Sequence, residues 1–302
     1  MNDSDTAWKE ILDAYFKDCL DYCLPELSAL INWEKGFVSL DKEFQAISKG
    51  TDSGKRILDK LFKVFLKSGR EQWVLIHIEI QGTPDEEFAK RMFIYGYRIY
   101  DKYQQPVVSC AILTDENKKW RPHRFEVGLA GSYLRSEFLP IKMIDYQNRQ
   151  DELDASMNPF ASVILVQLAA LKARVKPHEQ RKQVKFALTR RLYEKGFNKK
   201  EINNIYKFID WLIGLPSPFE IEYLEEVCEL EEAKKMAYIT SAERIGIEKG
   251  RKESAEEGKL EVAKLLLREG CEVALVEKTT GISLDQIKAL QQKLKKTERL
   301  FE

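Results

Sequence analysis

The sequence predicts an α/β protein in which a mixed sheet flanked by helices is followed by an all-helical C-terminal half. Two strand-like runs separated by KSGRE come first, followed by a long amphipathic helix and then by the short apolar run VVSCAIL. A hairpin, a helix and another strand in this order are typical of an α/β core. After NPFA the remaining segments have helical periodicity. We therefore expect a core in residues 1–157, a helical domain in 158–240 and a charged helical tail in 241–302.

The core elements are expected in the following order. Apolar residues at helical spacing predict one or two helices over 6–30, divided at Pro25, and a short helix over 40–47. Strands are expected at 57–66, 72–81 and 107–113, with one or two more within 121–143. Between them, a helix is expected from Pro84 to Tyr103, with Thr83 as its N-cap and Glu86 completing a capping box.

The second half is expected to contain helices at 160–172, 182–195, 199–213 and 220–239, with proline-containing breaks between them. Residues 276–294 have the form of a helix-turn-helix with Ser283 as an N-cap, and such a second helix can enter a DNA major groove. Few basic residues stand early in that helix, so a packing or oligomerisation element is the alternative.

Charge and cysteine content narrow the class of protein. Forty-nine basic residues balance forty-nine acidic ones, so no global field draws the chain to nucleic acid or to a membrane. The five cysteines lack metal spacing, which indicates reduced thiols. The N-terminus lacks the features of a signal peptide, and no apolar run approaches the ~20 residues of a membrane span. A cytoplasmic protein without a membrane partner is expected.

Candidate site residues stand at the end of the strand WVLIHIEIQG, where His77, Glu79 and Gln81 share one face with the apolar residues at its start. If the preceding turn is centred on Gly69, Asp59 lies directly opposite Glu79. A two-residue turn would instead place Asp59 on the other face. Converging carboxylates are typical of a Mg²⁺ or Mn²⁺ site, whereas ordinary solvated strand residues are the alternative.

The chain resembles a known family in several of these stretches. LDKEF, LIHIEIQG, FAKRMFIYGYRIYDKY, AILTD, NPFA and FIDWLIGLP are similar to the Rpn family of recombination-promoting, transposase-like nucleases, which belongs to the PD-(D/E)XK superfamily. The resemblance covers about residues 8–250. It implies a restriction-endonuclease-like fold with Asp59 and Glu79 as metal ligands. It also places Gln81 where a lysine is usual, and Glu43 as a catalytic residue from the preceding helix.

Substrate contacts are expected on the long helix. Arg91, Tyr95 and Arg98 stand at i, i+4 and i+7 and would gather two phosphate-binding guanidinium groups and a phenol on one stripe. The alternative is that the arginines pair with acidic neighbours and that Tyr95 belongs to the core. Gln81 is neutral, so it can orient a group but cannot accept a proton.

Three functions remain open at this point. The resemblance favours a Mg²⁺-dependent DNA endonuclease that acts in recombination or on mobile elements, with DNA as its partner. A catalytically weak or inactive relative that binds DNA or protein is the second. A structural α/β interaction protein is the third, and association of the chain with itself stays open.

Overall fold

The computed structural model describes residues 3–43, 58–67 and 73–236, together with 263, 266, 267, 273–280 and 287. The chain forms two compact units, Met1–Lys234 and Lys235–Glu302. The boundary expected at residue 157 lies inside the first unit. In the second unit, α11 (Val273–Thr280) and a small cluster of Ala263, Val276 and Ile287 are described. The remainder of the expected helix-turn-helix, Ser283 included, lies outside the described residues.

The core is a mixed five-stranded sheet, as the sequence predicts. Its order is β1-β2-β3-β4-β7, with β1 to β3 antiparallel and β3, β4 and β7 parallel. The strands span β1 (Phe37–Ser39), β2 (Leu58–Phe65), β3 (Trp73–Gln81), β4 (Val107–Leu113) and β7 (Leu139–Lys142). A separate hairpin is formed by β5 (Arg124–Leu129) and β6 (Ser132–Glu137). The region 121–143 therefore holds three strands rather than one or two.

The helices follow the predicted order closely. The first unit contains α1 (Asp3–Cys23), α2 (Pro25–Leu30), α4 (Phe88–Tyr103), α5 (Gln150–Ala155), α6 (Pro159–Ala173), α7 (His178–Glu194), α8 (Lys199–Leu212) and α9 (Ser217–Lys234), with 3-10 turns η1 (Trp33–Lys35) and η2 (Met143–Asn148). The division at Pro25 is confirmed. None of the helices in the described part of the chain is long and apolar enough to span a membrane.

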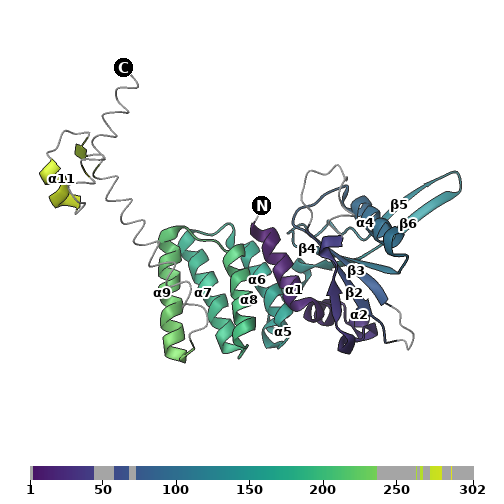
Figure 1. Ribbon diagram of the computed structural model, residues 1–302, viewed down its shortest axis with the longest axis horizontal. Helices are drawn as coiled ribbons and strands as arrows, with labels where there is room; N and C mark the ends of the chain where they lie inside the picture. Colours follow the sequence, from purple (N-terminus) through teal and green to yellow (C-terminus); the bar gives the residue numbers. More distant parts are fainter. Residues whose placement is uncertain are drawn as a thin grey trace, which may run out of the picture. The chain divides into compact units, whose positions relative to one another are not determined.

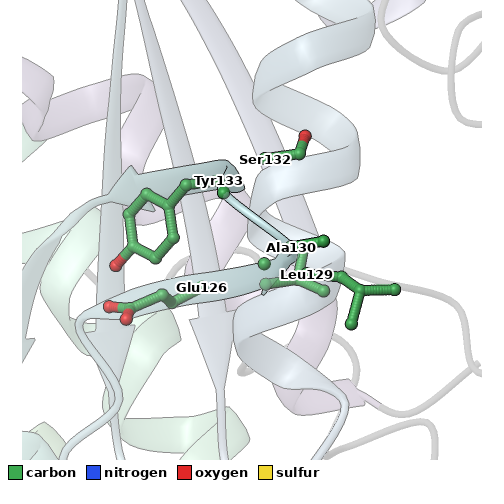
Figure 2. Close-up of a pocket in the computed structure, with 8 residues that line it drawn as sticks. Glu126, Leu129, Ala130, Ser132 and Tyr133 are labelled. Atoms are coloured by element: carbon green, nitrogen blue, oxygen red, sulfur yellow. The ribbon is translucent and has the colours of Figure 1, made fainter.

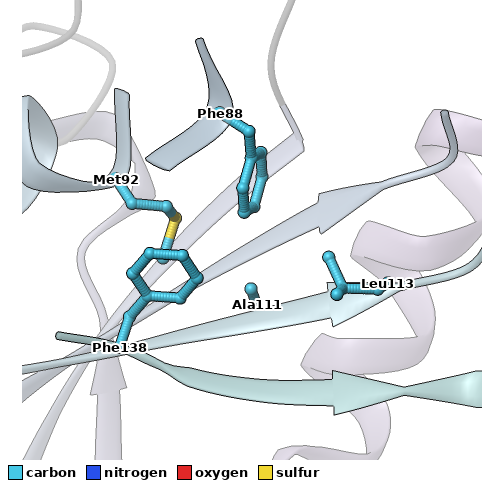
Figure 3. Packing of buried hydrophobic residues seen from close by; sticks show 5 residues of the cluster. All are labelled: Phe88, Met92, Ala111, Leu113 and Phe138. Atoms are coloured by element: carbon cyan, nitrogen blue, oxygen red, sulfur yellow. The ribbon is translucent and has the colours of Figure 1, made fainter. Parts of the chain in front are cut away.

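The two faces of the sheet are covered by different helices (Figure 1). On one face, Leu61 and Leu75 pack with Tyr95 and Ile99 of α4. Nearer the start of α4, Phe88 and Met92 pack onto Ala111, Leu113 and Phe138, as Figure 3 shows. On the other face, Phe62 stacks on Phe16 of α1, with ring centroids 3.9 Å apart. Helix α4 thus lies over the face of β3 that carries the odd-numbered residues.

Helix α4 begins later than the sequence predicts, and the expected capping box is wrong. The helix starts at Phe88, and its N-cap residue Glu87 makes no side-chain capping bond. The preceding turn is instead organised by Asp85, whose Oδ1 accepts a hydrogen bond from the Glu87 amide at 3.0 Å and whose carbonyl accepts one from Phe88. An aspartate that bonds the backbone two residues on forms a local turn, which replaces the first helical turn.

Candidate active site at the end of β3

The hairpin register brings the two predicted carboxylate positions together. In the antiparallel pairing of β2 and β3, Asp59 is the direct partner of Glu79, and Leu61 that of His77. Direct partners share a face of the sheet. Since Leu61 and Leu75 contact α4, Asp59 and Glu79 occupy positions on that same face. The register expected from a turn centred on Gly69 is thereby confirmed.

Glu79 is a fully buried carboxylate with two unlike oxygens. Its Oε1 accepts a hydrogen bond from Nε of Arg91 at 2.9 Å, while Oε2 has no hydrogen-bond partner among the described residues. Burial raises the pKa of Glu79 to about 7, against the opposing effect of the Arg91 guanidinium. A buried oxygen without a partner costs free energy.

Arg91 gathers three acceptors around one guanidinium group. Besides Glu79, it donates from Nη1 to Oδ2 of Asp85 at 2.7 Å and from Nη2 to Oε1 of Gln81 at 3.0 Å. The Gln81 amide in turn donates from Nε2 to the Thr83 carbonyl at 2.7 Å. The Arg91 side chain is 11% exposed and lies over the ring of Phe88. The end of β3, the following turn and the start of α4 are therefore tied together at one cation.

The other residues predicted for the site lie apart from this cluster. Tyr95 is 1% exposed and belongs to the core, as the alternative interpretation holds, and Arg98 is half-buried further along α4. Glu43 is exposed, and its charge acts on Tyr103 at the far end of α4. Within the described part of the chain, Glu43 has no hydrogen bond or ion pair with Glu79. His77 is fully buried, with Nδ1 3.4 Å from the Ser109 hydroxyl.

A loop whose first residues belong to the AILTD stretch begins beside Gln81. The Thr114 amide donates to the Gln81 carbonyl at 2.9 Å, and the next residue, Asp115, forms a buried ion pair with Lys142 at 2.5 Å. Lys142 also donates to the Trp120 carbonyl, which closes the loop over 115–120. Lys118 and Lys119 are exposed on this loop. It therefore carries two positive charges at the same edge of the sheet as Gln81.

The end of β3 carries oxygen atoms of the types that hard divalent cations take as ligands. Carboxylate and amide oxygens are the protein ligands that Mg²⁺ and Mn²⁺ accept. Glu79 Oε2 is buried and has no hydrogen-bond donor among the described residues, and the register sets a second carboxylate residue, Asp59, directly across the strand pair. Within the part of the chain that the structure describes, no three His, Cys, Asp or Glu side chains are grouped to hold a metal.

Comparison with known proteins gives one match. Residues 52–110 match the model of a family described as "Putative transposase, YhgA-like". Over these residues the chain is similar to that family. The YhgA-like segment runs from β2 to β4 and contains Asp59, Glu79, Gln81, Asp85 and Arg91. No curated protein and no solved structure matches the chain.

The role of Asp85 in the YhgA-like segment escapes sequence reasoning. Its position after Thr83-Pro84 suggests part of a helix start, whereas its side chain binds Arg91. The helical spacing of Arg91, Tyr95 and Arg98 indicates that they share one side of α4. It does not indicate that Arg91 pairs with Asp85. One feature of the sequence could have predicted the contact. Glu79 and Asp85 lie close together in the connection from β3 to α4, so a basic residue near the start of that helix, here Arg91, can reach both.

Proposed function

We propose that the chain is a metal-dependent DNA endonuclease of the PD-(D/E)XK type that hydrolyses phosphodiester bonds in DNA recombination or mobile-element processes. The observation that carries the proposal is the direct pairing of Asp59 with Glu79, whose buried Oε2 lacks a hydrogen-bond partner in the described chain. The family match supports a function related to transposases or nucleases. An antiparallel hairpin followed by a crossover helix and a parallel strand also agrees with the fold proposed here.

Asp59 and Glu79 would hold Mg²⁺ or Mn²⁺ in this proposal. A bound divalent cation supplies an acidified water as nucleophile and offsets the charge that develops on the phosphate. Gln81 is neutral and its amide is engaged at both ends, so it does not take the proton of the attacking water. In this proposal the exposed Lys118 and Lys119 would contact the DNA backbone.

A catalytically inactive relative that only binds DNA is the second candidate. It is favoured by one observation, the engagement of Oε1 of Glu79, the Gln81 amide and Asp85 with Arg91, which leaves few groups free for chemistry.

Cleavage of supercoiled plasmid DNA tests the proposal. The wild type should nick the plasmid with Mg²⁺ or Mn²⁺ but not with EDTA. Asp59→Asn and Glu79→Gln should each lower the rate by at least about 100-fold, which corresponds to about 2.7 kcal/mol of activation free energy. Glu137→Gln, which changes an exposed carboxylate of the β5–β6 hairpin, is the matched control and should cleave normally.

Two results would decide against the endonuclease. Absence of nicking, or nicking that is equal in Asp59→Asn and Glu79→Gln, would remove it. Salt-dependent DNA binding without cleavage in the wild type and both variants would establish the inactive DNA-binding relative instead.

A further inference from the structure

The guanidinium group of Arg91 is fixed on three sides. Its Nε, Nη1 and Nη2 atoms donate to Glu79, Asp85 and Gln81 respectively, and Nη2 also lies 2.9 Å from Oε1 of Glu79. Each contact is between 2.7 and 3.0 Å, and two of the three acceptors are carboxylates. Because the planar group has its donors in a rigid fork, satisfying three acceptors at once determines its position and orientation.

This arrangement makes the two oxygens of Glu79 inequivalent. Tilting the carboxylate plane away would break the bond between one of its oxygens and Arg91, and Arg91 cannot follow without leaving Asp85 and Gln81. Gln81 is itself held by the Thr83 carbonyl, so its oxygen stays directed at the guanidinium. Glu79 is fully buried. The plane of the carboxylate is thus fixed, with one oxygen on the guanidinium and the other directed away from it.

We infer that Arg91 is a positioning residue that holds Oε1 of Glu79 and so presents Oε2 to the divalent cation, with Gln81 and Asp85 as the braces that hold Arg91. The inference rests on the metal site of the proposed function. It gives Gln81 a role at the guanidinium rather than at the substrate. Partners that orient a metal-binding side chain typically change metal affinity by about 10–100-fold when removed.

A competing arrangement has the opposite consequence. If Arg91 occupied Glu79 in place of the cation, the metal would have to displace it, and removing Arg91 would tighten metal binding. If Arg91 only stabilised the fold, its removal would leave metal affinity unchanged. Metal affinity measured without DNA therefore separates the three roles by sign.

The experiment measures Mn²⁺ binding to the full chain by electron paramagnetic resonance and titration calorimetry. The variants are Arg91→Gln, Arg91→Lys, which keeps the charge but not the fork, and Asp85→Asn, which loosens Arg91 without removing it. Lys90→Gln is the matched control, since Lys90 is the neighbouring cation on α4 and pairs with Glu87 at the surface. We expect a Kd at least about 10-fold weaker in both Arg91 variants. Asp85→Asn should have a smaller effect in the same direction, and Lys90→Gln none.

Circular dichroism shows which variants are folded, and Arg91→Lys and Asp85→Asn carry the test if Arg91→Gln is not. Unchanged or tighter Mn²⁺ binding in the folded Arg91 variants overturns the inference, as does full affinity in Arg91→Lys. Glu79→Gln separates this failure from that of the proposed function. If Glu79→Gln weakens binding and the Arg91 variants do not, only the positioning role fails. If the wild type binds no Mn²⁺, or Glu79→Gln binds it equally well, the metal site fails and the inference with it.

Discussion

Lys142 shows how much a single buried charge can matter in this chain. Its side chain is 2% exposed and that of Asp115 is 3% exposed, and the pair closes the loop over 115–120. Lys142→Met leaves the Asp115 carboxylate buried without its cation, so we expect the free energy of unfolding to fall by about 3–5 kcal/mol. Urea denaturation measures this.

The surface pair between Arg121 and Asp145 is the control for this prediction. Both of its side chains are 48% exposed, so Arg121→Met should cost no more than about 1 kcal/mol. Equal losses in Lys142→Met and Arg121→Met would mean that the buried pair contributes no more than a solvated one.

Two cysteines of the first unit should differ in reactivity. A hydrogen bond from Cys19 lowers the pKa of Cys23, whereas burial raises the pKa of Cys110 to about 12. The thiolate is the reactive form, so the lowered pKa of Cys23 gives it the larger reactive fraction at a given pH. Timed N-ethylmaleimide labelling of the native protein with mass spectrometry should therefore modify Cys23 first. Faster labelling of Cys110 would contradict the burial that this expectation rests on.

At the scale of the element, the hairpin of β5 and β6 depends on one close approach. A Cβ at Gly128 would lie 2.8 Å from Cδ2 of Tyr133 and 2.9 Å from the backbone oxygen of Ser132, and the latter cannot move cheaply. Figure 2 shows Tyr133 and Glu126 side by side near this end of the hairpin, with Leu129 directed away from them. Phe125 anchors the hairpin by stacking on Phe93 of α4, with ring centroids 5.2 Å apart.

We expect Gly128→Ala to loosen the hairpin without unfolding the sheet. Hydrogen exchange over residues 124–137 should become faster, because the strand pairing must shift to relieve the clash. The global free energy of unfolding should fall by no more than about 1 kcal/mol, as is usual away from the core. Ser132→Ala, at the same turn, is the control. Unchanged exchange in Gly128→Ala would show that the chain accommodates a Cβ there.

The elements also show why some features are predictable from sequence and others are not. Alternation along WVLIHIEIQG assigns Glu79 to a face, and of the two registers that local rules allow, the structure has the one in which Asp59 pairs with Glu79. The start of α4 does not follow from local rules, because Asp85 satisfies the backbone of the turn while its other oxygen meets Arg91 six residues on. Local sequence propensity does not predict the contact between Asp85 and Arg91. For the same reason it does not predict that Arg91 binds Glu79.

At the scale of the whole first unit, α1 joins the sheet to the helical segments that follow residue 158. Phe16 of α1 stacks on Phe62 of the sheet, while Trp8 lies edge-on to Phe208 of α8 with ring centroids 5.0 Å apart. The change in composition at residue 158 lies inside this unit, where the two helical segments of α1, which meet at a kink at Tyr15, bury different residues against the two parts. The sequence shows the apolar periodicity of α1. It does not show that these apolar residues pack against both the sheet and α8.

This shared helix predicts that the sheet and the helices α6 to α9 unfold together. Trp8 is 3% exposed, and Trp8→Ala should lower the free energy of unfolding by about 3–5 kcal/mol. Hydrogen exchange in increasing urea should show protection lost at the same urea concentration in β3 and in α8, both in the wild type and, at lower urea, in Trp8→Ala. Glu10→Ala, on the exposed side of α1, should leave both unchanged. In a single cooperative unit, a substitution in α1 lowers the protection of β3 and α8 together. Loss of protection in α8 alone would therefore mean that the sheet and the helices unfold independently.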